Sequence, residues 1–233
     1  MTQLQARGVV KAYGRTPALR GVTLDVAEGE IVAVTGPSGC GKSTLLHCMA
    51  GILRPDAGEV TWRDQRIDLL SEAARSRLRR TEFGVLFQFG QLVAELTAAE
   101  NVALPLLLAG TGRREARTAA LNWLEWLGVA DVADTRPGEM SGGQQQRCAT
   151  ARALVTEPRV LFADEPTGAL DTLTGEQVLT TLVRLAREQR TSIVLVTHEP
   201  RIAAYADREV VLRDGKIDQT GLGLDVSLAG GQR

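Results

Sequence analysis

The chain has 233 residues, of which 44% are hydrophobic and 24% are charged, an ordinary composition for a globular domain with a sizeable core. Its 27 basic and 28 acidic residues leave a formal net charge of −1, which excludes bulk attraction to nucleic acid or to an anionic membrane. Three cysteines and two histidines without CxxC spacing do not form the pattern of a structural zinc site, and they suit a reducing cytoplasm.

The sequence predicts no segment that enters a membrane. The first residues, MTQLQARGVVKAYG, lack the basic segment and long apolar core of a signal peptide. The longest strongly apolar run, residues 102–109, is far shorter than the roughly 20 residues that cross a bilayer. We therefore expect a soluble chain, which works at a membrane only if another chain supplies the spanning part.

The first part of the chain predicts a β-rich unit followed by a helix. Residues 4–36 are typical of a series of short strands broken by glycines, and the β-branched run at residues 30–36 predicts a buried strand. A helix is expected from Lys42 to about Ala50. Further strands are expected at residues 58–63 and 82–88.

Residues 97–156 predict a helical segment. Thr97 and Glu100 form a capping box, and Pro105 is expected to kink or end the helix that starts there. A second helix, closing at Gly128, carries large apolar residues at helical spacing. These are Leu121, Trp123, Leu124, Trp126 and Leu127.

Strands and helices alternate again after residue 156. A strand at residues 159–165, a helix from about Leu173 to Gln189 and a strand at residues 191–198 are followed by a hairpin that turns at Asp214-Gly215. The sequence thus predicts a β/α/β core with parallel strands, interrupted by an all-α segment.

The most specific motif, GPSGCGKST, follows a strand and opens a helix, as a phosphate loop of the GxxxxGK[ST] type does. Its glycines let backbone N–H groups turn toward phosphate oxygens, and the helix start adds positive charge. Lys42 is expected to reach the β- and γ-phosphates, and the Ser43 hydroxyl to ligate Mg²⁺. The alternative, a glycine-rich turn with a surface lysine, does not explain the register. The predicted nucleotide-binding residues are Gly36, Pro37, Ser38, Gly39, Cys40, Gly41, Lys42, Ser43 and Thr44.

Two carboxylates end the strand at residues 159–165. Asp164 reaches the sheet edge where the phosphate loop lies, as expected of a residue that holds Mg²⁺ through water. Glu165 is the candidate general base for the attacking water. Because neighbouring strand residues point to opposite faces, the strand must end or bend there for both to serve one site, and Pro166 favours this. The alternative is a solvated acidic pair.

Gln88 and His198 also follow strands. The carboxyl ends of parallel strands converge on the ligand crevice, so we interpret both residues as nucleotide sensors. A structural or solvated role is the alternative for each. His47, inside the helix after the phosphate loop, is interpreted as a packing or surface residue.

A second glycine-rich helix start lies in EMSGGQQQRCATARAL, residues 139–154. Ser141 and Gln144 form a capping box, which alone predicts a well-started helix. Gly142 and Gly143 weaken the first turn, which makes sense if a ligand approaches the backbone. Bare N–H groups and a hydroxyl at a helix start form an anion site. The spacing leaves open whether this anion is the nucleotide at Lys42.

Together these motifs resemble the ATP-binding cassette (ABC) ATPases, the motor subunits of ABC transporters, over nearly the whole chain. Their order is the phosphate loop, Gln88, the signature MSGGQQQR at 140–147, VLFADEP at 160–166, GALD at 168–171 and the switch residue His198. The resemblance implies an α/β fold of the P-loop NTPase (RecA-like) type, with a parallel-sheet core, an N-terminal antiparallel β subdomain and an inserted α-helical subdomain. It implies one nucleotide-binding domain, residues 1–233, with a core at 1–88 and 157–233 and the helical subdomain at 89–156.

The resemblance further implies an ATPase that binds ATP and Mg²⁺. The signature of one copy closes over ATP held by the other, so a homodimer encloses two ATP molecules. The partners are this second copy and a separate integral-membrane permease, with no nucleic acid, and the chain lies peripherally on the cytoplasmic face of the cell membrane. The implied catalytic residues are Glu165, His198 and Lys42, the metal-binding ones Ser43, Gln88 and Asp164, and the further nucleotide-binding ones Tyr13, Ser141, Gly142, Gly143, Gln144 and Asp171.

GVLFQFGQLVAELTAAENVALPLLLAG and DEPTGALD look most like the macrolide-exporter and lipoprotein-releasing branch, which predicts an exporter. Met140 in place of the usual leucine conserves volume, and Cys40 lies at a variable position, so neither puts activity in doubt. The alternative is a cell-division ATPase that transmits conformational change without cargo. Genome-maintenance and translation relatives carry coiled coils, zinc modules or fused cassettes, and a small-molecule kinase is disfavoured by Glu165 and the signature.

Overall fold

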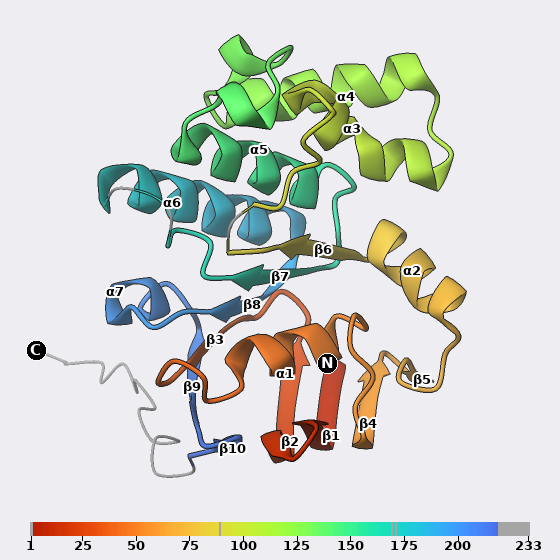
Figure 1. Cartoon of the computed structure of the whole chain (residues 1–233), viewed down its shortest axis with the longest axis vertical. Helices are drawn as coiled ribbons and strands as arrows, with labels where there is room; N and C mark the ends of the chain where they lie inside the picture. The colour runs from red at the N-terminus through yellow and green to blue at the C-terminus, as the bar shows by residue number, and fades with distance from the viewer. Residues whose placement is uncertain (1, 89, 169, 171, 219–233) are drawn as a thin grey trace, which may run out of the picture.

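The computed structural model describes residues 2–88, 90–168, 170 and 172–218, which form two sheets and a layer of helices (Figure 1). Asp171 lies outside these residues. Within the described part of the chain, no helix combines the length and the apolar character that crossing a bilayer requires.

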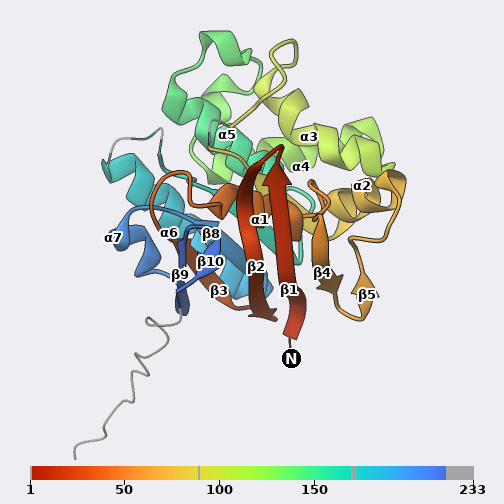
Figure 2. The ribbon, with the colours of Figure 1, turned by 60° about the horizontal axis from the view of Figure 1, so that its bottom comes forward.

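An antiparallel sheet is built from the N-terminal residues, in the order β2-β1-β4-β5. In Figure 2 this sheet lies in front of α1. Its strands are β1 (Thr2–Tyr13), β2 (Thr16–Ala27), β4 (Ala57–Trp62) and β5 (Gln65–Arg66). The predicted series of short strands is wrong, because β1 and β2 each run for 12 residues. Gly8 and Gly21, with φ of 58° and 88°, lie at register shifts between these strands, so the glycines make bulges and do not end the strands.

The second sheet has the order β10-β9-β3-β8-β7-β6, and all neighbours are parallel except the terminal β9–β10 hairpin. The hairpin turns at Asp214-Gly215, as predicted, and both residues have positive φ. The strands are β3 (Ile31–Thr35), β6 (Phe83–Leu86), β7 (Val160–Asp164), β8 (Ser192–Val196), β9 (Arg208–Arg213) and β10 (Lys216–Ile217).

Helices cover both faces of the parallel sheet. On one face, Phe162 of β7 packs with α1 and the antiparallel sheet; on the other, Leu161 and Ala163 pack with α5 and α6. The helices are α1 (Lys42–Met49), α2 (Glu72–Thr81), α3 (Ala98–Ala109), α4 (Arg113–Trp126), α5 (Gly142–Leu154), α6 (Thr172–Gln189) and α7 (Pro200–Ala203).

The inserted segment contains α3, α4 and α5 and has an apolar cluster of its own. The Thr97–Glu100 capping box is confirmed at the start of α3. Of the two effects predicted for Pro105, a kink or an end of the helix, the end is wrong, because α3 continues through Pro105 to Ala109 and is capped by Gly110, whose φ is 99°. Burial of Ala99 and Val102 holds the helix together despite the missing N–H. Helix α5 also contributes Ala149 and Leu154 to the apolar cluster beneath the parallel sheet. It therefore joins the inserted segment to the core that contains this sheet.

Gly84 of β6 lets α5 lie directly against the parallel sheet. A Cβ on Gly84 would lie 2.2 Å from the Ala153 carbonyl oxygen and 2.9 Å from the Pro158 Cγ. We expect Gly84→Ala to lower the free energy of unfolding by about 1–3 kcal/mol, the cost of overpacking a close-packed site. Urea unfolding monitored by circular dichroism measures this change. Gly112→Ala is the control, because nothing lies within 4 Å of a Cβ there. Equal midpoints for the two variants would contradict the packing argument.

Candidate functional site

The phosphate loop connects β3 to α1, and two of its glycines are required by close backbone approaches. Gly36 and Gly41 have φ of 140° and 109°. A Cβ on Gly36 would lie 2.0 Å from the Leu212 carbonyl oxygen, and one on Gly41 would lie 2.4 Å from the Ala18 carbonyl oxygen. No side chain but hydrogen fits at either position. By contrast, nothing lies within 4 Å of a Cβ on Gly39, whose backbone borders open space.

Lys42 and Ser43 open α1 directly after the loop. The buried Lys42 Nζ donates to the carbonyl oxygens of Gly36 and Pro37, both at 2.9 Å, so the ammonium is held inside the loop. The Ser43 hydroxyl lies close enough to Asp164, at the end of β7, to lower the pKa of that carboxyl. The loop and the strand end are therefore in contact, as the sequence predicted.

Asp164 is buried, with 7% of its surface exposed. Burial raises its pKa above the usual 3.8, while the Ser43 hydroxyl and the nearby Lys42 act in the opposite direction. His47 belongs to the same environment: burial lowers its pKa, Asp164 opposes that shift, and its ring lies 5.9 Å from the Phe87 ring. The interpretation of His47 as a packing residue fits this contact, and its closeness to Asp164 was not predicted.

Because the folded chain binds a proton at Asp164 more tightly than the unfolded chain, the carboxylate lowers stability as pH rises through and above its usual pKa. Asp164→Asn keeps an acceptor for Ser43 and removes the charge. We expect it to raise the Tm of the nucleotide-free chain at pH 7, by about 2–4 °C for each 1 kcal/mol of stability gained in a chain of this length. The gain should fade as pH falls to about 4. Calorimetry at both pH values measures it, and a lower Tm for the variant at pH 7 would contradict the account.

Glu165 lies directly after β7, and the chain turns there as predicted. Its φ is 45°, a left-handed conformation that is costly for a non-glycine residue and that redirects the side chain. Gln88 Nε2 donates to Glu165 Oε2 at 2.9 Å. His198 Nδ1 lies 2.8 Å from Glu165 Oε1, and because an ionised carboxylate only accepts, the ring nitrogen donates. Gln88 and His198, which follow two other strands, thus both contact the Glu165 carboxylate.

A cleft of about 710 Å³ lies between the phosphate loop on one side and β9 with the segment after β8 on the other. Residues 36–40 line one side, and His198, Pro200 and Glu209 line the other. The Thr35 hydroxyl donates to Glu209 at 2.7 Å and joins the two sides at the base. The backbone of the glycine-rich loop and the polar residue that follows β8 therefore border one open space.

The second glycine-rich helix start lies away from this cleft. Among the described residues, no hydrogen bond or ion pair joins residues 141–144 to residues 36–44, and α5 and α1 lie on opposite sides of strands β6–β8 (Figure 1). The capping box is confirmed: Ser141 Oγ accepts from Gln144 N at 3.2 Å, and Gln144 Oε1 accepts from Ser141 N at 2.9 Å. The exposed Ser141 hydroxyl keeps its own hydrogen free to donate outward.

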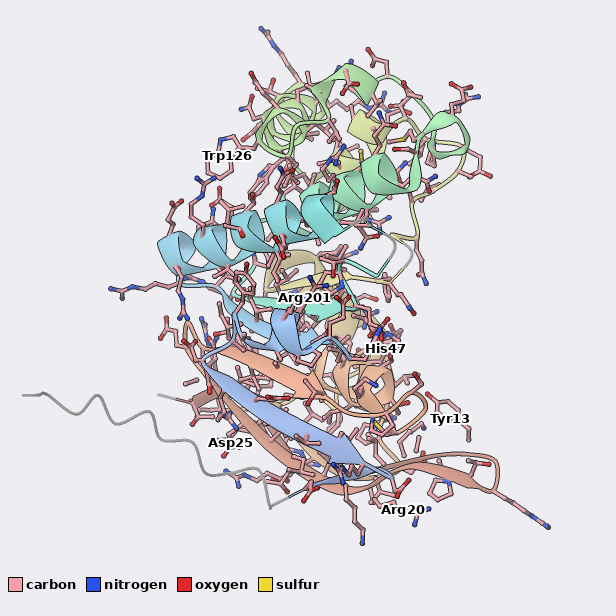
Figure 3. The ribbon with its side chains drawn as sticks, turned by 90° about the vertical axis from the view of Figure 1, so that its left-hand side faces the viewer. Tyr13, Arg20, Asp25, His47, Trp126 and Arg201 are labelled. Carbon is pink, nitrogen blue, oxygen red and sulfur yellow. The ribbon has the colours of Figure 1, made fainter. Side chains whose placement is uncertain are left out.

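Tyr13, at the end of β1, is 54% exposed. Figure 3 shows it at the same edge of the molecule as His47 of α1. Its side chain is open to a ligand that approaches the phosphate loop from that edge.

The oxygen-bearing groups around the loop fit a hard divalent cation. Asp164, Ser43 and Gln88 offer a carboxylate, a hydroxyl and an amide oxygen, the donors that Mg²⁺ accepts. The described residues contain no group of three or more His, Cys, Asp or Glu that would hold a metal unaided.

Two residues of α5 that reach this site were not predicted. Gln146 donates to the Pro166 carbonyl, and Arg152 donates to the carbonyls of Gly90 and Gln91. The sequence does show that Gln146 and Arg152 are polar residues among the small apolar residues of this helix. Only the fold shows which backbone carbonyls they bind.

The chain matches the sequence pattern of the family described as "ABC transporter" over residues 19–168. It is 47% identical over 219 residues to "Lipoprotein-releasing system ATP-binding protein LolD 2" of Caulobacter vibrioides, which covers 92% of this chain and 96% of that protein. It is 48% identical over 198 residues to "Lipoprotein-releasing system ATP-binding protein LolD" of Koribacter versatilis, covering 85% and 89%.

A solved structure is similar over the entire fold. It is the "Dimeric structure of a post-hydrolysis state of the ATP-binding cassette MJ0796 bound to ADP and Pi", with a TM-score of 0.89 and 37% sequence identity. The similarity covers 93% of this chain and 97% of that chain. The predicted fold class is confirmed by this match together with the two observed sheets and inserted helices.

Proposed function

The chain belongs to the ABC transporter family as an ATP-binding subunit that hydrolyses ATP, and from this premise we propose that it drives a lipoprotein-releasing membrane complex. The proposal of cargo rests on the two relatives named for lipoprotein release, each covered over most of its length. In this proposal the chain binds to the cytoplasmic face of the cell membrane through an integral-membrane permease. Its single nucleotide-binding domain consists of a core, residues 1–88 and 157–233, and a helical subdomain, residues 89–156.

The observation that carries the mechanism is the meeting of Gln88, Glu165 and His198 beside the phosphate loop. In the proposed reaction Glu165 accepts a proton from the water that attacks the γ-phosphate, giving ADP and phosphate. Both carboxylate oxygens of Glu165 have partners, Gln88 on one and His198 on the other, and in this proposal these two side chains orient the base. Lys42 neutralises charge on the β- and γ-phosphates.

Mg²⁺, when bound, neutralises phosphate charge and orients the oxygens that react. We propose that Ser43 and Asp164 hold it, with Gln88 at the edge of its coordination sphere. The other loop residues except Pro37, which has no backbone N–H, contribute N–H donors to the phosphates. Tyr13 stacks on the adenine, and Asp171 stays a nucleotide-binding residue in this proposal.

The outward-facing signature supports a homodimer with shared ATP sites. Ser141, Gly142 and Gly143 begin α5, which lies on the other side of strands β6–β8 from α1, the helix that Lys42 opens. These donors would therefore meet the γ-phosphate of ATP bound by a second copy. The dimeric state of the similar ATP-binding cassette supports the same arrangement.

A groove of about 550 Å³ beside β6 is the proposed seat of the permease. It lies where the core meets the inserted helices, and it is lined by Ile52, Phe83, Phe87, Gln91, Pro105 and Arg152 among others. A partner helix seated there would contact the segment after Gln88, so motion could pass between that segment and the membrane.

Reconstitution tests this function. The chain and its cognate permease are placed in proteoliposomes with an acylated lipoprotein, and release of the lipoprotein to a soluble acceptor is followed with and without ATP. We expect release that requires ATP hydrolysis. Hydrolysis without release of lipoprotein, or of any other cargo, would favour the cell-division alternative, in which the ATPase only transmits conformational change.

A further inference from the structure

Helix α5 contacts the chain segment immediately beyond Glu165. Gln146 Nε2 donates to the Pro166 carbonyl oxygen at 2.8 Å, and the Gln146 side chain is 1% exposed. A buried amide without a partner is costly, so this bond is worth more than a surface contact. Since Pro166 follows Glu165, Gln146 fixes the backbone on one side of the carboxylate.

The same helix contacts the segment that carries Gln88. Arg152 donates to the carbonyl oxygens of Gly90 at 2.6 Å and of Gln91 at 2.8 Å. Both residues have positive φ, 67° and 49°, so the segment is turned sharply where the guanidinium holds it. A Cβ on Gly90 would lie 3.2 Å from the Ala149 Cβ and 3.5 Å from Gln146 Oε1, so the segment lies close against α5.

These two contacts converge on one side chain. Gln88, two residues before Gly90, donates to Glu165 Oε2, and Glu165 precedes Pro166. The carboxylate is therefore held through α5 along two routes: Gln146 acts on its backbone, and Arg152 acts on its hydrogen-bond donor.

We propose that Gln146 and Arg152 are positioning residues that set the placement of Glu165 within their own subunit. This inference rests on the proposed role of Glu165 as the general base. Ser141 begins the same helix, and Gln146 and Arg152 lie five and eleven positions further along it. A displacement of the signature by the partner's nucleotide would thus reach Glu165 through one rigid element.

Two variants remove these contacts with little change in volume. Gln146→Met loses the donor to Pro166, and Arg152→Lys keeps the charge but loses the planar fork that reaches two carbonyls. We expect each to lower the kcat of ATP hydrolysis about tenfold, the effect of one lost hydrogen bond to the transition-state geometry. The ATP concentration at half-maximal rate should stay unchanged, because the hydrogen bonds found for these two side chains go to Pro166, Gly90 and Gln91 and not to the phosphate loop.

Thr150→Val is the matched control. Thr150 is fully buried on α5, and its hydroxyl donates only within the helix, to the Gln146 carbonyl at 2.9 Å. We expect this variant to keep wild-type kcat, and thermal unfolding of all three variants shows whether their stabilities match. An equal loss of kcat in Thr150→Val would mean that any disturbance of α5 slows turnover, which would overturn the proposal.

A double-mutant cycle separates positioning from general structural support. If both residues act through Glu165, adding Gln146→Met or Arg152→Lys to Glu165→Gln should leave the residual single-turnover rate unchanged. A further tenfold loss in that background would overturn the proposal. If Glu165→Gln itself turned over ATP like the wild type, the proposed function of Glu165 would fail. Slow turnover by Glu165→Gln with full activity of the α5 variants would refute only the positioning role.

Discussion

Replacing Glu165 with glutamine is expected to slow steady-state ATP hydrolysis by about 100-fold or more, the scale of losing a general base. The substitution keeps the shape of the side chain and its acceptor oxygen for the Gln88 amide, which donates at 2.9 Å in the wild type. It removes the basic oxygen that would take the proton of the attacking water. ATP binding should persist, because Lys42 and the phosphate loop are unchanged.

Phosphate release and equilibrium binding of a fluorescent ATP analogue measure the two effects separately. Glu188→Gln is the control, since Glu188 is exposed on α6 and the chemical change is identical. Wild-type turnover in the Glu165 variant would remove this residue from the role of base and would leave His198 as the strongest remaining candidate.

Ser141→Arg is expected to leave ATP binding to the separate chain intact and to abolish turnover. The Ser141 hydroxyl is exposed, and a long cation at the same place would block the approach of a partner's phosphate and break the capping box. ATP binding to the phosphate loop of the same chain should be unaffected, because α5 and the phosphate loop lie on opposite sides of strands β6–β8.

Nucleotide binding and phosphate release again provide the two readouts. Thr118→Arg replaces an exposed hydroxyl on α4 of the same helical segment and should behave as the wild type. If Ser141→Arg abolished ATP binding by the separate chain, the signature would act within one subunit, and the shared-site account would be wrong.

The size of these contacts makes an ATP-dependent dimer reasonable. A hydrogen bond to a charged group contributes about 1.5–3 kcal/mol, so three donors from Ser141 and the adjacent backbone would give roughly 5–9 kcal/mol per nucleotide before the cost of association. Two nucleotides could hold two copies together, and loss of phosphate after hydrolysis would remove most of that attraction. A contact that closes with ATP and opens after hydrolysis can perform mechanical work on a permease.

The sequence predicted those parts of the fold that follow from local chemistry. The turn at Asp214-Gly215, both capping boxes and the end of β7 at Asp164 were predicted from residue type and spacing, and all are present. The errors came from residues whose effect depends on context. Glycines favour breaks between short strands, yet at Gly8 and Gly21 the paired neighbour strand accommodates them as bulges. Pro105 does not end its helix, because the buried face of α3 outweighs one lost hydrogen bond.

The residues of the candidate site were predicted better than the hydrogen bonds between them. Gln88, Glu165 and His198 were each placed at a strand end, but their hydrogen bonds depend on the strand order β8-β7-β6 and on the left-handed turn at Glu165. Gln146 and Arg152 could not be assigned partners from spacing alone, because those partners are backbone carbonyls far away in the sequence.

Mixing two inactive variants tests most directly whether each ATP site is shared between two copies. Lys42→Ala disables the phosphate loop, and Ser141→Arg disables the signature, so each variant alone should hydrolyse almost no ATP. A dimer of one of each kind has one intact site, formed by the phosphate loop of the Ser141→Arg copy and the signature of the Lys42→Ala copy. The account predicts that the mixture recovers single-turnover hydrolysis that neither variant shows alone. A mixture as inactive as its components, in preparations where both chains are folded, would contradict it.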